Sequence, residues 1–245
     1  MKGKPRQHYF TVSFSYKLCS LRRSYIGNRA PKGLSFRIDE TTQMRKKTEA
    51  RRLSFVNTAG KLFTERGFDA VTMEAIAAAA GTSKVTLYGY YPSKDALFEA
   101  FVVEAGHGGF AALEASKDDA DLRQSLLRLG VAYLDLTTRP NVVALNRLII
   151  GAAGRQPQLS RTFYENGPKR TLLSICDALE SLMERGLLRR APLRQAGLYF
   201  KSLCEAGILE RQLWGLDPTP DPARRQAAVL SAMDAFLPAY LPPPP

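Results

Sequence analysis

Side chains able to hold the phosphate groups of a nucleic acid are concentrated between Thr72 and Phe98, in the segment TMEAIAAAAGTSKVTLYGYYPSKDALF. Hydroxyl and ammonium groups donate hydrogen bonds to phosphate oxygens, and the first turn of a helix adds backbone N–H groups and a favourable dipole. Contacts of this kind fix the position of a protein on a duplex without reading its sequence. The predicted phosphate donors are Thr72, Ser83, Lys84, Tyr88 and Lys94.

A second set of side chains in the same segment could read bases. A helix over residues 84–90 would turn Leu87 and Tyr91 inward. In a major groove, threonine bonds to either base type, and valine contacts the methyl group of thymine. Glycine weakens a helix by about 1 kcal/mol relative to alanine, and we expect it here to permit close approach to DNA. Because this face has no Arg, Asn or Gln, DNA shape should share in the discrimination. The predicted reading face consists of Val85, Thr86, Gly89 and Tyr90, with Tyr88 at its edge.

Four helices must hold these groups in place. Apolar residues recur at three- and four-residue spacing over residues 44–66, which predicts a first amphipathic helix that ends at Gly67. Thr72 is the predicted N-cap of a second helix, and Gly81 ends it. A proline ends the third helix, and Ser93 caps a fourth. Two short helices joined by a glycine-containing turn are typical of a helix-turn-helix reader of double-stranded DNA.

The rest of the chain keeps a helical pattern, and Pro and Gly separate its segments. No alternation of apolar and polar residues of convincing length predicts a strand. We therefore expect an all-α fold with an N-terminal three-helix DNA-binding domain and a helical bundle. The predicted helices of the bundle are 121–138, 140–153, 157–186, 193–214 and 221–240. The predicted divisions are a basic arm (1–43), the DNA-binding domain (44–95), a regulatory and dimerisation domain (96–241) and a Pro-rich tail (242–245).

Positive charge is concentrated in the N-terminal part of the chain. The formal net charge is +12, and residues 1–43 hold nine Lys and Arg against two acidic residues. Residues 44–98 hold nine against five, and residues 99–245 hold 17 against 16. This distribution indicates a polyanionic partner for the first 98 residues. Residues 1–43 have three interpretations: a basic arm without ordered structure, a targeting segment, or a region that precedes translation from Met44.

The sequence offers little for catalysis or metal binding. His8 and His107 are the two histidines, and neither has a Ser/His/Asp or metal-ligand arrangement around it. The three cysteines lack ligand spacing and are odd in number, so we expect reduced thiols in a cytoplasmic protein. No stretch approaches the roughly 18 apolar residues that a membrane span needs. We therefore expect no enzyme activity, no cofactor, no metal and no membrane contact. The cysteines are Cys19, Cys176 and Cys204.

The DNA-binding segment resembles that of the TetR/AcrR family of bacterial transcriptional regulators over about fifty residues. The chain departs from the usual pattern at Thr82, Val85 and Gly89, positions that bear on base preference and not on the fold. The matching residues are Phe63, Gly67, Thr72, Met73, Ile76, Ala77, Ala80, Gly81, Ser83, Thr86, Leu87, Tyr88, Tyr90, Tyr91, Lys94, Leu97 and Phe98.

The resemblance implies a second domain that binds a small-molecule effector and forms a homodimer through two long helices, here 193–214 and 221–240. A two-fold dimer would place two reading helices about 34–36 Å apart on a palindromic operator. The segment that begins LSRTFYENG is similar to the ligand domain of an AefR-like or AcrR-like subgroup. The common mode of the family is repression. The aromatic and polar residues that are candidates for a ligand pocket are Phe110, Tyr133, Arg147, Phe163, Tyr164 and Tyr199.

The alternative to a sequence-specific repressor is a sequence-neutral nucleic-acid-binding protein driven by the basic N-terminal arm. Charge-driven binding falls steeply with salt, whereas a regulator keeps its site in the presence of competitor DNA. The residues alone leave open the identity of the effector and of the operator.

Overall fold

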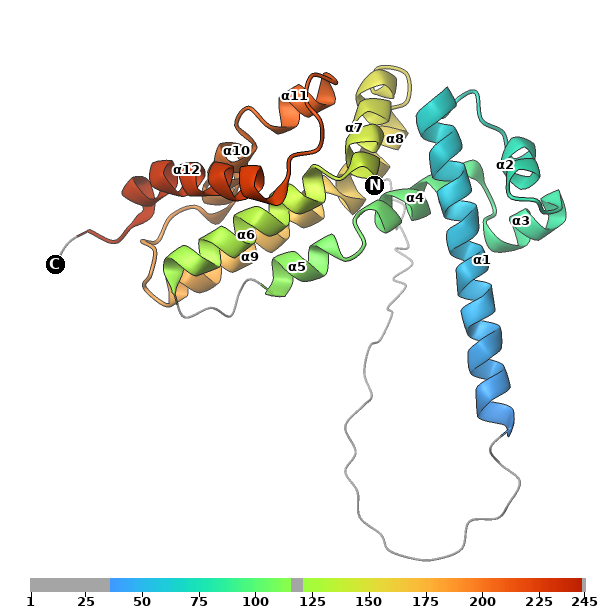
Figure 1. Cartoon of the computed structure of the whole chain (residues 1–245), viewed down its shortest axis with the longest axis horizontal. Coiled ribbons are helices and arrows are strands. Elements are labelled where there is room, and N and C mark those ends of the chain that lie inside the picture. The colour runs from blue at the N-terminus through green and yellow to red at the C-terminus, as the bar shows by residue number, and fades with distance from the viewer. Residues whose placement is uncertain (1–35, 116–120, 244–245) are drawn as a thin grey trace, which may run out of the picture. The chain divides into compact units, whose positions relative to one another are not determined.

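The computed structural model describes residues 36–115 and 121–243, and these residues form helices and no strand (Figure 1). The chain divides into two compact units, Met1–Met44 and Arg45–Pro245. The second unit contains α2 to α12 and most of α1. The helices are α1 (Phe36–Arg66), α2 (Met73–Ala79), α3 (Lys84–Tyr90), α4 (Lys94–Ala105), α5 (Gly109–Ala115), α6 (Leu122–Thr137), α7 (Pro140–Ala152), α8 (Pro157–Asn166), α9 (Pro168–Glu184), α10 (Leu193–Glu205), α11 (Leu209–Leu213) and α12 (Pro222–Tyr240).

Helix α1 begins at Phe36, eight residues before the expected start at Met44. The sequence between Gly33 and Gly60 contains neither Gly nor Pro, so no residue of that stretch interrupts a helical backbone. The expected end at Gly67 is confirmed, because this glycine has a φ of 82°. Residues 1–35 of the predicted basic arm (1–43) lie outside the described residues. Residues 36–43 belong to α1, so the arm was predicted too long at its C-terminal end.

One hydrophobic cluster joins the N-terminal helices. Its members include Phe63 of α1, Ile76 of α2 and Leu87 of α3, all of which are fully buried. Phe98 of α4 packs edge-on against Phe63, with ring centroids 6.1 Å apart. The cluster continues beyond α4 to residues of α7 and α8, so α4 is shared between the reading helices and the rest of the unit. The members from α7 and α8 are Leu145, Ile149, Ala152 and Leu159.

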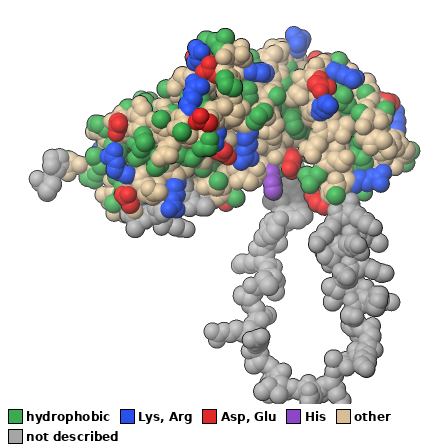
Figure 2. Space-filling model, viewed as in Figure 1, with side chains coloured by type: hydrophobic (Ala, Val, Ile, Leu, Met, Phe, Trp, Pro, Cys, Tyr) green, Lys and Arg blue, Asp and Glu red, His purple; other side chains and the backbone are tan. Residues whose placement is uncertain are grey.

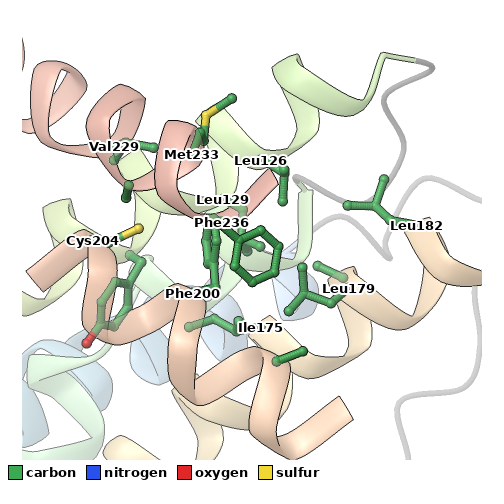
Figure 3. Packing of buried hydrophobic residues seen from close by; sticks show 14 of the residues in the cluster. Leu126, Leu129, Ile175, Leu179, Leu182, Phe200, Cys204, Val229, Met233 and Phe236 are labelled. Atoms are coloured by element: carbon green, nitrogen blue, oxygen red, sulfur yellow. The ribbon is translucent and has the colours of Figure 1, made fainter. Parts of the chain in front are cut away.

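A second cluster fills the centre of the C-terminal bundle, between α6, α9, α10 and α12 (Figure 3). Phe200 of α10 meets Phe236 of α12 edge-on at 5.3 Å between ring centroids. Phe236 in turn stacks on Tyr240 at 4.2 Å. The periodic apolar residues of these helices therefore form a single core. Its other labelled members in Figure 3 are Leu126, Leu129, Ile175, Leu179, Leu182, Cys204, Val229 and Met233.

Two of the predicted long helices are each divided in two. The expected helix 157–186 is interrupted at Gly167, because Pro168 lacks the N–H of a helical hydrogen bond and its ring would clash with the preceding turn. The expected helix 193–214 is interrupted around Gly207, whose φ of 71° lies in the left-handed region. The predicted helices 121–138, 140–153 and 221–240 agree with α6, α7 and α12 to within about two residues.

Figure 2 shows Lys and Arg side chains interspersed with Asp and Glu over the visible face of the described residues. The mixture of signs agrees with the nearly neutral composition of residues 99–245. Among the described helices, none has the length and apolar character required to cross a membrane. Within the same part of the chain, no group of three or more His, Cys, Asp or Glu side chains is arranged to hold a metal ion.

The two described cysteines are free thiols that differ in burial. Burial raises the pKa of Cys204 to about 12, and nearby Glu205 acts in the same direction. Because the thiolate is the reactive species, we expect iodoacetamide to alkylate Cys204 at pH 8 only after denaturation. Cys176 is half-buried, and we expect faster alkylation there in the native protein. Peptide mapping by mass spectrometry measures both sites, and native labelling of Cys204 at the rate of Cys176 would contradict the prediction.

Candidate functional site

A tight turn connects α2 to α3. Gly81 has a φ of 61°, and its N–H donates to the carbonyl oxygen of Ala78 at 3.1 Å. The N–H of Thr82 donates to the carbonyl oxygen of Ala77 at 3.0 Å. These two bonds form a Schellman motif, which satisfies the last carbonyls of α2 and reverses the chain into α3. The helix-turn-helix arrangement predicted from Gly81 is therefore present.

Hydroxyl side chains cap the N-termini of α2, α3 and α4. Thr72 accepts from the N–H of Ala75 at 3.2 Å, and Ser83 accepts from the N–H of Thr86 at 3.1 Å. Ser93 accepts from the first turn of α4 in the same way. The hydroxyls of Ser83 and Thr86 also lie 2.8 Å apart, so one donates to the other. Only one hydroxyl hydrogen of that pair is therefore left for a phosphate oxygen.

The outward face of α3 agrees with the prediction at four positions. Val85 is 83% exposed and Tyr88 is 41% exposed, whereas Leu87 is fully buried. Thr86 is half-buried beside this face, and Gly89 is exposed. A Cβ atom added to Gly89 would meet no atom within 4 Å, so packing within the protein does not require glycine there. The face offers a small, mostly apolar surface to whatever lies against it.

The ring of Tyr90 does not lie on the outward face. We expected this residue on the outward face, but its ring packs edge-on against Phe55 of α1, with centroids 5.3 Å apart. Tyr90 follows the buried Leu87 by three residues, and helical residues three apart lie about 60° from one another on the same side. The side chain therefore joins the inward face and is half-buried.

Both predicted lysines already have partners within the protein. Lys84 forms an ion pair with Glu74 of α2 on the surface, and the pair raises the pKa of Lys84 and lowers that of Glu74. Lys94 donates to the carbonyl oxygen of Phe68 at 2.8 Å and lies 4.2 Å from the centre of the Phe68 ring. Lys94 thus fastens the first turn of α4 to the α1–α2 connection. An ammonium group has three N–H donors, so these contacts leave donors for a phosphate.

Arg51 of α1 is a candidate that the sequence reasoning did not select. Its guanidinium donates to the hydroxyl of Thr82 at 3.2 Å, and the side chain is exposed beside the turn. An apolar residue at position 82 could not accept this bond. The sequence placed Arg51 in a basic run but gave no signal that links positions 31 residues apart.

A cavity of about 310 Å³ lies in the C-terminal part of the unit, between α4, α6, α7 and α10. Phe110, Tyr133 and Phe163 line it, as three of the six pocket candidates. The other three are not among the lining residues. Arg147 donates to the carbonyl oxygens of Gln212 and Leu213 and so ties α7 to α11. Tyr164 and Tyr199 are 45% and 53% exposed.

Three side chains form a polar cluster on the cavity wall. Lys201 donates to both carboxylate oxygens of Glu205, each at 2.9 Å, one turn apart on α10. The Tyr133 hydroxyl of α6 donates to the same carboxylate. Burial raises the pKa of Tyr133 well above its usual value, and the carboxylate of Glu205 adds to the rise. The phenol is therefore a neutral donor at physiological pH.

Two family models match separate parts of the chain. Residues 55–101 match the model described as bacterial regulatory proteins of the tetR family. Residues 124–242 match the model described as the C-terminal domain of AefR-like transcriptional repressors. The two matches coincide with the turn-linked short helices and with the helices around the cavity.

Known proteins and solved structures agree with these matches. An uncharacterized HTH-type transcriptional regulator of Mycobacterium tuberculosis is 39% identical over 70 residues, which is 29% of this chain. The match spans 33% of the length of that relative. The structure of the flavonoid-responsive regulator FrrA is 32% identical and covers 80% of this chain and 100% of its own, with a TM-score of 0.69. A TetR-family regulator from Mesorhizobium loti, 24% identical, has a TM-score of 0.70 over 79% of this chain and 98% of its own.

Proposed function

Since the chain belongs to the TetR family of DNA-binding transcriptional regulators, we propose that it is a repressor that a small molecule releases from a palindromic operator. The family consists of regulators and not of enzymes. The observation that carries the proposal is the presence of an exposed reading face and of a cavity in one unit, with α4 shared between the core beneath the reading helices and the cavity wall.

DNA recognition is assigned to α3 and the capped helix ends around it. The proposed base-reading residues are Val85, Thr86 and Gly89, and the proposed phosphate donors are Thr72, Ser83, Lys84, Tyr88 and Lys94. We add Arg51 to the phosphate donors because it is exposed next to the turn. The ring of Tyr90 supports the packing of α3 on α1, which leaves its hydroxyl as the group proposed to contact DNA.

A homodimer supplies the second reading helix. Most apolar residues of α10 and α12 pack in the core of the monomer, including Phe200, Val229 and Phe236. Two large apolar side chains on these helices stay open: Tyr199 is 53% exposed and Leu230 is 41% exposed. A shallow groove between α10 and α12, lined in part by Tyr199 and Leu203, provides a surface for the same helices of a partner. These features support a two-fold interface.

Release of DNA follows from the position of α4. The first half of this helix contributes Leu97 and Phe98 to the N-terminal core. Val102 and Ala105 of its last turn line the cavity, together with the C-cap residue Gly106. A ligand that fits better when α4 is displaced would favour dimers whose reading helices no longer match successive major grooves. FrrA is described as flavonoid-responsive, which supports an aromatic effector for this chain.

The test is selection of a binding site from random duplexes, followed by footprinting on the selected site. We expect an inverted repeat that is protected in the presence of excess competitor DNA, and sedimentation of the free protein as a dimer. A variant that lacks residues 1–35 keeps the whole of α1 and should retain the site preference. Loss of all binding in that variant, or the absence of any protected repeat, would favour the sequence-neutral alternative.

Gly89 provides a direct test of close approach to DNA. Substitution of Gly89 by alanine is expected to raise the free energy of unfolding by about 0.5–1 kcal/mol, because alanine is the better helix former and the added Cβ meets open space. Affinity for the selected operator should nevertheless fall. Thermal unfolding and fluorescence anisotropy measure the two effects on the same sample. A variant that is more stable and binds DNA as tightly as the original would exclude a backbone–DNA contact at this position.

A further inference from the structure

The walls of the cavity are mainly apolar. Val102, Leu136, Leu145, Phe163 and Leu209 contribute side chains from five different helices or their ends. Such walls favour a ligand with a largely apolar frame, and the rings of Phe110 and Tyr133 suit a flat one. This composition excludes small, highly polar metabolites as the preferred ligand.

The charges on the cavity wall cancel. Lys201 and Glu205 are the two charged residues among the lining residues, and they bond to one another through both carboxylate oxygens. Their side chains are 26% and 20% exposed, so the pair is largely shielded from water. An anionic or cationic ligand would have to separate this pair or remain without a counter-charge in an apolar surrounding, and both are costly. The cavity is therefore suited to an uncharged molecule.

The two threonine hydroxyls of the wall donate their hydrogens within the protein. The Thr137 hydroxyl donates to the carbonyl oxygen of Tyr133 at 3.0 Å, and the Thr171 hydroxyl donates to that of Gly167 at 3.1 Å. The amide nitrogen of Asn146 donates to a carbonyl oxygen of its own helix at 2.9 Å. Each hydroxyl has a single hydrogen, so the two threonine oxygens are left to a ligand as acceptors only, while Asn146 keeps a second N–H donor and its carbonyl oxygen. The wall is rich in acceptors.

From these observations we infer that the effector is an uncharged molecule with a flat apolar frame and two or more hydroxyl groups, whose O–H donors meet the oxygens of Glu205, Thr137 and Thr171. Lys201 uses two of its three N–H donors on the Glu205 carboxylate, so the third can donate to a hydroxyl oxygen of the same ligand. The inference rests on the proposed function, which gives the cavity its role as an effector site.

The test is calorimetric binding to the full-length protein without DNA, with four probes. They are the flavanone naringenin, its fully O-methylated ether, cinnamate as an aromatic anion and benzyltrimethylammonium as an aromatic cation. We expect naringenin to bind at least about tenfold more tightly than the ether, because the ether offers no donor to the acceptor oxygens. The two ions should bind more weakly than naringenin. Equal binding of naringenin and the ether, or preference for either ion, would overturn the inference.

Two variants test the residues. Glu205→Gln keeps the shape of the side chain and leaves the charge of Lys201 uncompensated, so cinnamate should gain affinity relative to naringenin. Thr137→Val keeps the shape of the side chain and removes one acceptor. Naringenin should therefore bind several-fold more weakly, while the affinity for the ether stays unchanged. If Glu205→Gln does not fold, this second variant still tests the ligand class. Glu65→Gln is the matched control, because Glu65 forms an i, i+4 pair with Lys61 on α1, away from the cavity. Unchanged selectivity in both cavity variants would contradict the assignment.

The two proposals fail in different ways. A protein that binds naringenin by calorimetry but protects no inverted repeat would refute the proposed function and leave the ligand class standing. A protein that protects an operator and is released by an ion in preference to a neutral polyol would refute the ligand class alone.

Discussion

Replacement of Leu87 by alanine is expected to unfold the helix-turn-helix region and abolish operator binding. Leu87 is fully buried at the centre of the cluster formed by α1, α2, α3 and α4. Removal of a buried leucine side chain costs about 2–5 kcal/mol through lost burial and the cavity left behind. This loss is a large share of the roughly 5–15 kcal/mol that stabilises an ordinary domain. Urea unfolding followed by circular dichroism should show the midpoint fall sharply.

Val85, two residues earlier on the same helix, is the matched control. Its side chain is 83% exposed, so Val85→Ala should change the free energy of unfolding by no more than about 0.5 kcal/mol. On DNA, this variant should alter base preference at one or two operator positions, which repeated site selection measures. Similar destabilisation by the two substitutions would contradict the placement of α3, and uniform weakening on all sequences by Val85→Ala would contradict the reading face.

Replacement of Phe200 by alanine is expected to have a comparable effect on the C-terminal bundle. Phe200 is fully buried and packs edge-on against Phe236, where α10 meets α12. Truncation of a buried phenylalanine costs about 3–5 kcal/mol, and the edge-on pair adds to the loss. Thermal unfolding at fixed protein concentration measures this change, since a dimer makes the midpoint depend on concentration.

Substitution of Tyr199, the residue before Phe200, distinguishes a role in the dimer interface from a role in the core. It is 53% exposed in the monomer, so Tyr199→Ala should leave the core intact. If α10 and α12 form the dimer interface, this substitution should weaken dimerisation, which sedimentation equilibrium detects. The assignment of the interface fails if Tyr199→Ala sediments as the unsubstituted protein does, and the assignment of the core fails if Phe200→Ala unfolds at the unchanged temperature.

Local signals in the sequence were sufficient for the helices and turns near the reading face. Thr72 and Ser93 are N-caps as predicted, because a cap depends on residues three positions away, and Ser83 caps α3 in the same way. Gly81 takes the left-handed conformation that a helix end requires. The helices α6, α7 and α12 also follow from periodicity, since each presents one apolar stripe to a single core.

Contacts between distant positions were not predictable. The cluster on the cavity wall joins Tyr133 to Glu205 across 72 residues, and no periodic pattern encodes such a pair. Lys94 donates to the backbone carbonyl oxygen of Phe68. Any residue at position 68 would supply the same carbonyl, so the residue type there gives no signal of this bond. The misplaced ring of Tyr90 has a different cause: this position lies about 60° from the buried Leu87, at the border between the two faces, and it was assigned to the outward one.

The dual role of α4 has a consequence for the construction of chimaeric regulators. Phe98 belongs to the N-terminal core, while Val102 and Ala105 form part of the wall around the effector. A graft that joins a foreign DNA reader at Pro92 would leave the donor's reader to pack on a helix shaped for this one. A junction placed after Gly106 instead transfers α4 whole and exchanges two side chains of the cavity wall, those of Val102 and Ala105.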